Sequence, residues 1–92
     1  MSGPPVRVTV TIANERGMHA RPAARFVECA GKFSADIQVT RSGVTVSGRS
    51  IMGLLMLGAV QGAEIEIEAA GPDAEAAATA LAELVRRGFD DA

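Results

Sequence analysis

The only histidine of this 92-residue chain lies in the segment Gly17-Met18-His19-Ala20-Arg21-Pro22-Ala23-Ala24. Pro22 fits the first turn of a helix, because the N–H that proline lacks would have no intrahelical partner there. His19 is therefore expected at or just before a helix N-terminus, where free backbone N–H groups and the positive end of the helix dipole favour an anion. A neutral imidazole at this point would be a nucleophile beside a phosphate-binding site.

Two interpretations of His19 follow. A single histidine taken without its context is most often a surface side chain in a loop. Here the positive end of a helix disfavours imidazolium, so the ring is expected to stay neutral and nucleophilic near pH 7. Arg21 could add a charge-assisted contact to phosphoryl oxygens. Arg25, one turn further on, either shares that face or is a solvated surface arginine.

Ser50 is the second residue with potential chemistry. It precedes the apolar stretch from Ile51 to Leu57 and is expected to cap a short helix through its hydroxyl group. A phosphate added to such a serine would place about two negative charges at a favourable helix end. The stretch is apolar on nearly all sides, so part of it belongs to the core and part is expected to form an exposed docking surface.

Other site chemistries find less support in the chain. One histidine and a distant Cys29, with no carboxylate pair beside them at ligand spacing, do not make a metal site, and we expect no metal or cofactor. Cys29 lies in the middle of a predicted helix and is expected to be a buried structural thiol.

Length and composition predict one small domain over residues 1–92, with a core of aliphatic side chains because the chain has three Phe and no Trp or Tyr. The net charge of −2 is uneven, with +4 on residues 1–50 and −6 on residues 51–92. The positive half suits an anionic ligand or an acidic partner, but its scattered charges do not favour nucleic acid. A lone cysteine, no secretory signal and no long apolar run predict a cytoplasmic protein without membrane insertion.

Hydrophobic periodicity predicts the elements that must position these residues. Four segments alternate with a period of two, as strands with one wet face do, and two have helical spacing. The compact apolar stretch after Ser50 is expected to be a third, short helix. The order of these segments predicts an α+β fold, an open-faced sandwich in which a four-stranded antiparallel sheet is covered on one face by three helices. The strands are expected at 6–12, 37–39, 44–46 and 64–68, and the helices at 20–30, 51–57 and from 73 to about 87.

Two segments together resemble a known family. Gly17 to Ala23 is similar to the active-site segment of HPr, the histidine-containing phosphocarrier protein of the phosphoenolpyruvate-dependent sugar phosphotransferase system. Arg49 to Leu55, continuing to the strand at 64–65, resembles the regulatory serine segment of that family. The likeness runs from the first strand to the end of the last helix, and it implies the same open-faced β-sandwich.

The resemblance implies a set of roles. His19 would accept a phosphoryl group on Nδ1 from phosphorylated enzyme I and donate it to an enzyme IIA component, with Arg21 balancing the charge. Ser50 would be phosphorylated by the HPr kinase/phosphorylase. The protein would be a stoichiometric carrier and a monomer. The residues matching the family's partner-binding face are Arg25, Ile51, Met52 and Leu55.

Some features do not follow the family pattern or leave a choice open. Asn14-Glu15-Arg16 adds a charge pair next to the active-site segment, Ala24 replaces a hydroxyl residue found in some members, and the tail from Gly88 to Ala92 carries no motif that we can interpret. The alternative function is a regulatory binding module that acts through Ser50 and the 51–57 patch in nitrogen or carbon regulation rather than in sugar uptake, with His19 idle. A small domain that binds a metabolite or RNA would need a pocket or a basic stripe that the sequence does not indicate.

Overall fold

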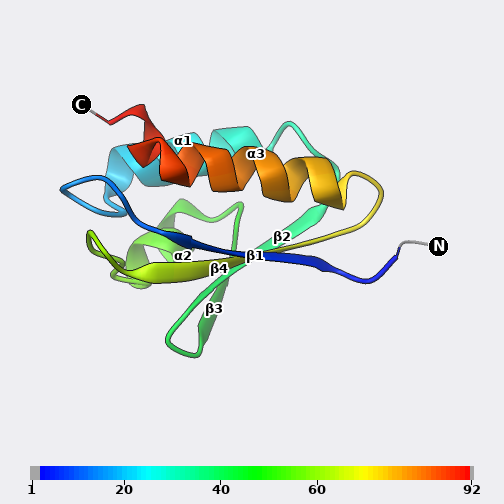
Figure 1. The fold of residues 1–92 in the computed structure, drawn as a ribbon, viewed down its shortest axis with the longest axis horizontal. Coiled ribbons are helices and arrows are strands. Elements are labelled where there is room, and N and C mark those ends of the chain that lie inside the picture. Colours follow the sequence, from blue (N-terminus) through cyan, green and yellow to red (C-terminus); the bar gives the residue numbers. More distant parts are fainter. Residues whose placement is uncertain (1–2, 92) are drawn as a thin grey trace.

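The computed structural model describes residues 3–91, so Met1, Ser2 and Ala92 of the predicted domain lie outside the described residues. Strands and helices follow one another in the predicted order, and a short 3-10 helix extends the chain beyond α3 (Figure 1). The elements are β1 (Val6–Thr11), α1 (Ala20–Ala30), β2 (Asp36–Arg41), β3 (Val44–Ser47), α2 (Ile51–Met56), β4 (Glu64–Ala70), α3 (Ala74–Arg86) and η1 (Gly88–Asp90).

The four strands form one antiparallel sheet in the order β1-β4-β2-β3. The register places apolar side chains opposite one another on the covered face, as in the pairs Val10 with Ile65 and Val39 with Ile67. On the other face Arg7 is opposite Glu68, and the two side chains form an ion pair of 2.6 Å. Because successive side chains point to opposite faces, apolar and polar residues alternate along the sequence of each strand.

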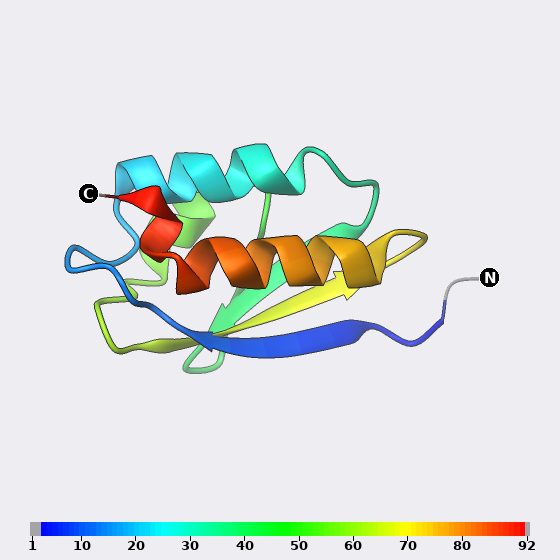
Figure 2. The same cartoon turned by 45° about the horizontal axis from the view of Figure 1, so that its top comes forward.

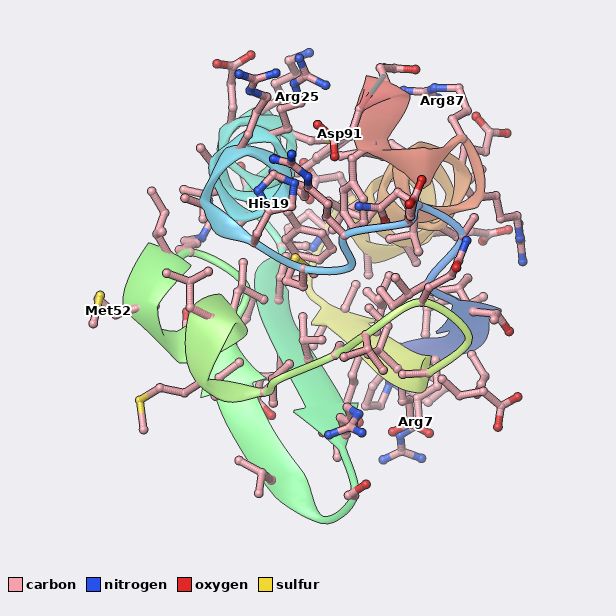
Figure 3. All side chains as sticks on the ribbon, turned by 90° about the vertical axis from the view of Figure 1, so that its left-hand side faces the viewer. Arg7, His19, Arg25, Met52, Arg87 and Asp91 are labelled. Atoms are coloured by element: carbon pink, nitrogen blue, oxygen red, sulfur yellow. The ribbon has the colours of Figure 1, made fainter. Side chains whose placement is uncertain are left out.

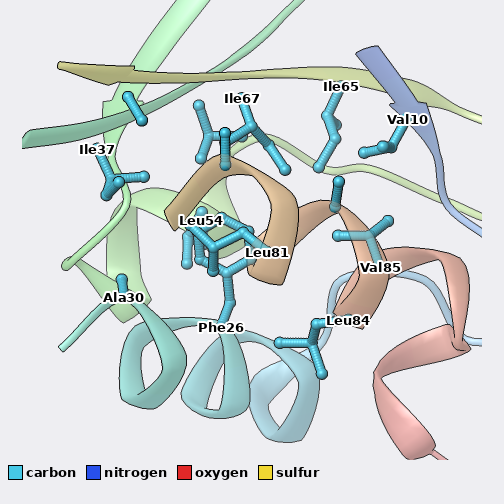
Figure 4. Packing of buried hydrophobic residues seen from close by; sticks show 14 of the residues in the cluster. Val10, Phe26, Ala30, Ile37, Leu54, Ile65, Ile67, Leu81, Leu84 and Val85 are labelled. Carbon is cyan, nitrogen blue, oxygen red and sulfur yellow. The ribbon is translucent and has the colours of Figure 1, made fainter. Parts of the chain in front are cut away.

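Helices α1 and α3 run antiparallel, side by side, over one face of the sheet (Figures 1 and 2). The short helix α2 packs between α1 and β3. Phe26, Leu54 and Leu81 meet between the helices and the strands, and all three are fully buried (Figure 4). The predicted α+β sandwich is therefore confirmed.

Two details differ from a simple interpretation of the sequence. Asp73 stands at the start of α3, but its carboxylate accepts hydrogen bonds from the amides of Ser34 (2.8 Å) and Ala35 (2.7 Å) instead of capping its own helix. The residues after α3 do not trail away, because η1 turns back with Phe89 fully buried. Within residues 3–91, no helix is both long enough and apolar enough to cross a membrane.

Candidate phosphoryl-acceptor site

The loop between β1 and α1 holds His19 in a fixed place. Gly17 adopts a left-handed conformation (φ 68°), and a Cβ atom there would come within 2.4 Å of the Ala59 carbonyl oxygen. The next residue, Met18, donates its amide to the same carbonyl group at 2.9 Å. The close approach that only glycine allows thus joins this loop to the segment before β4.

His19 is the N-cap residue of α1, as predicted. Its backbone is extended, and its carbonyl group accepts the first helical hydrogen bond from Ala23 at 3.0 Å. The amides of Ala20 and Arg21 precede that first bond, and Pro22 has no N–H, so two amides at this helix end lack an intrahelical acceptor. The imidazole ring therefore stands beside amides that could receive an anion.

The ring lies in an open pocket with mixed charges. The pocket is lined by Glu15, Arg16, His19, Ala20, Arg21 and Asp91. The His19 side chain is 33% exposed, which leaves it accessible to a partner. Two arginines and two carboxylates surround one imidazole, and both members of the Glu15–Arg16 charge pair belong to the site.

A residue of the C-terminal segment contacts the ring directly. The Asp91 Oδ2 atom lies 2.9 Å from His19 Nε2, and the two side chains point toward one another (Figure 3). Only 8% of the Asp91 side chain is exposed. The hydrogen bond from His19 is the main reason that the pKa of the Asp91 carboxyl lies below its ordinary value, with smaller contributions from Asn14 and from the charge of Arg21. Among residues 3–91, no hydrogen-bond partner is found for His19 Nδ1.

The Arg25 side chain contributes to the site indirectly, by binding a backbone carbonyl group of the C-terminal segment. It does not line the pocket around His19, and its Nη1 donates to the Phe89 carbonyl group at 2.5 Å. The C-terminal segment 88–91 is fixed further by the burial of Phe89 and by a hydrogen bond from the Asp91 amide to the Gly88 carbonyl group at 3.0 Å. Of the two interpretations open for Arg25, neither describes this contact.

Ser50 is the N-cap residue of α2, as predicted, and its Oγ atom accepts a hydrogen bond from the Gly53 amide at 3.0 Å. Beyond it, three side chains of α2 that are exposed form what we call the α2 patch. Its members are Ile51, Met52 (69% exposed) and Met56 (78% exposed). Leu54 faces the core and Leu55 is half-buried, so the stretch is divided between core and surface as expected.

Sequence reasoning missed Asp91, and it named Met56 only as part of the 51–57 stretch. The indication for Asp91 was indirect, because Phe89 is one of only three Phe and follows a glycine after an amphipathic helix. Such a side chain is most often buried, and the burial of Phe89 brings the residues after it back onto the fold. No group of three or more His, Cys, Asp or Glu side chains that could hold a metal ion is found in the part of the chain that the structure describes.

Comparisons with known proteins show the family of this chain. The family described as "PTS HPr component phosphorylation site" matches residues 6–87. Phosphocarrier protein HPr of Treponema pallidum is 39% identical over 83 residues, covering 90% of this chain and 94% of that protein. Phosphocarrier protein NPr of Escherichia coli is 40% identical over 87 residues, covering 94% and 97%.

A solved structure gives the same result for the fold. HPr-C-His from Thermoanaerobacter tengcongensis superimposes with a TM-score of 0.89 at 42% identity, covering 95% of this chain and 98% of that one. Sequence and fold thus agree with this family over nearly the whole chain. The chain belongs to the HPr family of phosphocarrier proteins of the phosphotransferase system.

Proposed function

We propose that this protein carries a phosphoryl group on His19 Nδ1, taking it from phosphorylated enzyme I and passing it to an enzyme IIA component in the cytoplasm. It acts stoichiometrically as a monomer, not as an enzyme that turns over by itself. The observation that carries the proposal is the position of His19, which caps α1 beside two amides without intrahelical acceptors and shares an open pocket with Arg16 and Arg21.

The protein assists phosphoryl transfer mainly by positioning the reacting groups and by balancing the charge of the phosphoryl oxygens. The lone pair of Nδ1 attacks phosphorus, and the bond between phosphorus and the donor breaks with its electron pair remaining on the donor. The phosphoryl oxygens then accept hydrogen bonds from the amides at the start of α1, and Arg21 balances their charge. The onward step runs in the opposite sense, with the imidazole as leaving group.

The experiment is phosphorylation in solution. The protein is incubated with enzyme I and radiolabelled phosphoenolpyruvate, with a His19→Ala variant as control. We expect one phosphoryl group per chain, labile in acid and stable in alkali as a phosphoramidate is, and none on the variant. An equally labelled His19→Ala variant, or an unlabelled wild type, would contradict the proposal.

Ser50 supports a second function, regulation of this traffic. The serine caps α2 directly before the α2 patch, so a phosphate there would add negative charge to a surface that is otherwise apolar. Aspartate can also cap a helix, so Ser50→Asp adds charge without removing the cap. We expect Ser50→Asp to accept phosphate at His19 more slowly than wild type, and Ser50→Ala to accept it at the wild-type rate. Equal rates for all three proteins would contradict this role.

A further inference from the structure

The C-terminal segment reaches the candidate site from the far end of the sequence. Asp91 and His19 are 72 positions apart, yet their side chains are 2.9 Å apart. The contact is not a loose tail resting on the surface, because Phe89 is fully buried and Arg25 binds its carbonyl group. Gly88, with φ 70°, lies against Asn14, so the turn that leads to Asp91 packs on the same loop that holds His19.

The chemistry of the pair fixes which ring nitrogen carries the proton. An ionised carboxylate only accepts hydrogen bonds, so Nε2 must be the donor. A neutral imidazole has one N–H, and Nδ1 then carries the lone pair.

We propose that Asp91 is a positioning residue for phosphoryl transfer, holding His19 in the tautomer whose Nδ1 is free to attack. The inference rests on the function proposed above. When Nδ1 bonds to phosphorus, the ring gains positive charge and its Nε2 proton stays in place, hydrogen-bonded to the carboxylate. In the onward step the same proton remains, so the ring leaves as a neutral imidazole and no proton has to move.

The other charges around the ring are compatible with this role. A carboxylate near an incoming phosphoryl group is unfavourable by itself, but Arg16 and Arg21 line the same pocket and offset it. Glu15 is the remaining acidic group of the lining. The Asp91 carboxylate contacts Nε2, whereas the phosphoryl group would bind to the opposite nitrogen.

The test combines a spectroscopic and a kinetic measurement on three variants. Asp91→Asn keeps the shape of the side chain, but an amide can both donate and accept, so it no longer selects one tautomer. Asp91→Glu keeps the carboxylate. Asp90→Asn is the matched control, because the neighbouring Asp90 carboxylate is exposed and pairs with Arg87 at 3.1 Å.

In the unphosphorylated wild type, ¹⁵N NMR of His19 should show a protonated Nε2 and an unprotonated Nδ1. Asp91→Asn should move both shifts toward a mixture of tautomers and slow phosphoryl acceptance by about 10- to 100-fold, the loss typical when the hydrogen-bonded partner that orients a metal-ligating histidine is removed. Asp91→Glu should restore most of the rate, and Asp90→Asn should match wild type.

Unchanged ¹⁵N shifts in Asp91→Asn would overturn the inference, and so would changed shifts with a wild-type rate. The NMR measurement needs no phosphoryl donor, so it separates this inference from the proposed function. If wild type shows the predicted tautomer but no phosphorylation at His19, the proposed function fails, independently of the Asp91 contact. Thermal melting curves confirm that each variant is folded.

Discussion

At the scale of the residue, the site depends on how one imidazole is surrounded. Backbone amides at the start of α1 and Arg21 can receive an anion beside His19, and Asp91 holds the proton on Nε2. His19, Arg21 and Pro22 could be identified from the sequence alone, because they lie within four consecutive residues. The Asp91 contact could not be found in that way, since it depends on how a buried Phe89 turns the chain after α3.

Arg21 is expected to matter through charge and shape together. Arg21→Ala should slow phosphoryl acceptance on the order of 10- to 100-fold, because hydrogen bonds to charged groups are among the stronger ones in proteins. Arg21→Lys keeps the charge but not the planar fork and should lose less. Rapid-quench assays of transfer from phosphorylated enzyme I measure the rate of phosphoryl acceptance by both variants. An alanine variant as fast as wild type would show that the amides alone suffice.

The Asp91 contact also predicts a dependence of stability on pH. The pKa of this carboxyl is lower in the folded protein than its ordinary value, above all through the hydrogen bond from His19. Such a group adds stability that is present above the ordinary pKa of about 3.9 and is lost as pH falls through the lowered value. The melting temperature of wild type should therefore exceed that of Asp91→Asn at neutral pH, and the difference should shrink as the pH falls below the ordinary pKa of the carboxyl. A difference that does not change with pH would argue against the contact.

At the scale of the element, the positions of helices and strands could be predicted because each has one buried face. The periods of two and 3.6 follow directly from that geometry, and the helix start at Pro22 and the cap at Ser50 are local signals. The order of strands in the sheet could not be predicted in this way, since pairing between β1 and β4 joins residues that are far apart in sequence. Asp73 shows the same limit, because the amides that donate to its carboxylate lie in the loop before β2.

The loop that carries His19 gives a prediction about stability. Gly17→Ala should lower the free energy of unfolding by about 2–4 kcal/mol, because alanine disfavours the left-handed conformation and its Cβ would collide with Ala59. Gly58→Ala is a matched control, since Gly58 has a similar φ of 61° but open space around its Cβ position. It should lose only about 1–2 kcal/mol. Urea unfolding measures both, and equal losses would mean that the contact with Ala59 contributes nothing.

At the scale of the whole molecule, the fold places a polar surface and an apolar surface on different elements. The open face of the sheet is polar, with Arg7 and Glu68 paired across it, whereas the α2 patch is an exposed apolar surface. In Figure 3 the Met52 side chain extends away from the ribbon, and the β2–β3 hairpin lies at the bottom of the view, away from His19. The α2 patch is therefore the surface on which we expect phosphotransfer partners to dock.

Met52 tests this expectation. Met52→Glu should leave thermal stability within about 0.5 kcal/mol of wild type, because the side chain is 69% exposed. It should raise the KM for phosphorylation by enzyme I about fivefold or more, because a charge would enter an apolar contact. Val44→Glu, on the hairpin at 52% exposure, is the control and should leave KM unchanged. Equal KM values for the two variants would place the docking surface elsewhere.

The most direct test of the central claim is the position of the phosphoryl group itself. The protein, labelled with ¹⁵N at histidine, is phosphorylated with phosphoenolpyruvate and enzyme I, and ³¹P and ¹⁵N NMR spectra are recorded. The account predicts a bond from phosphorus to His19 Nδ1, with the proton retained on Nε2. A phosphoryl group on Nε2, or on any other residue, would contradict it.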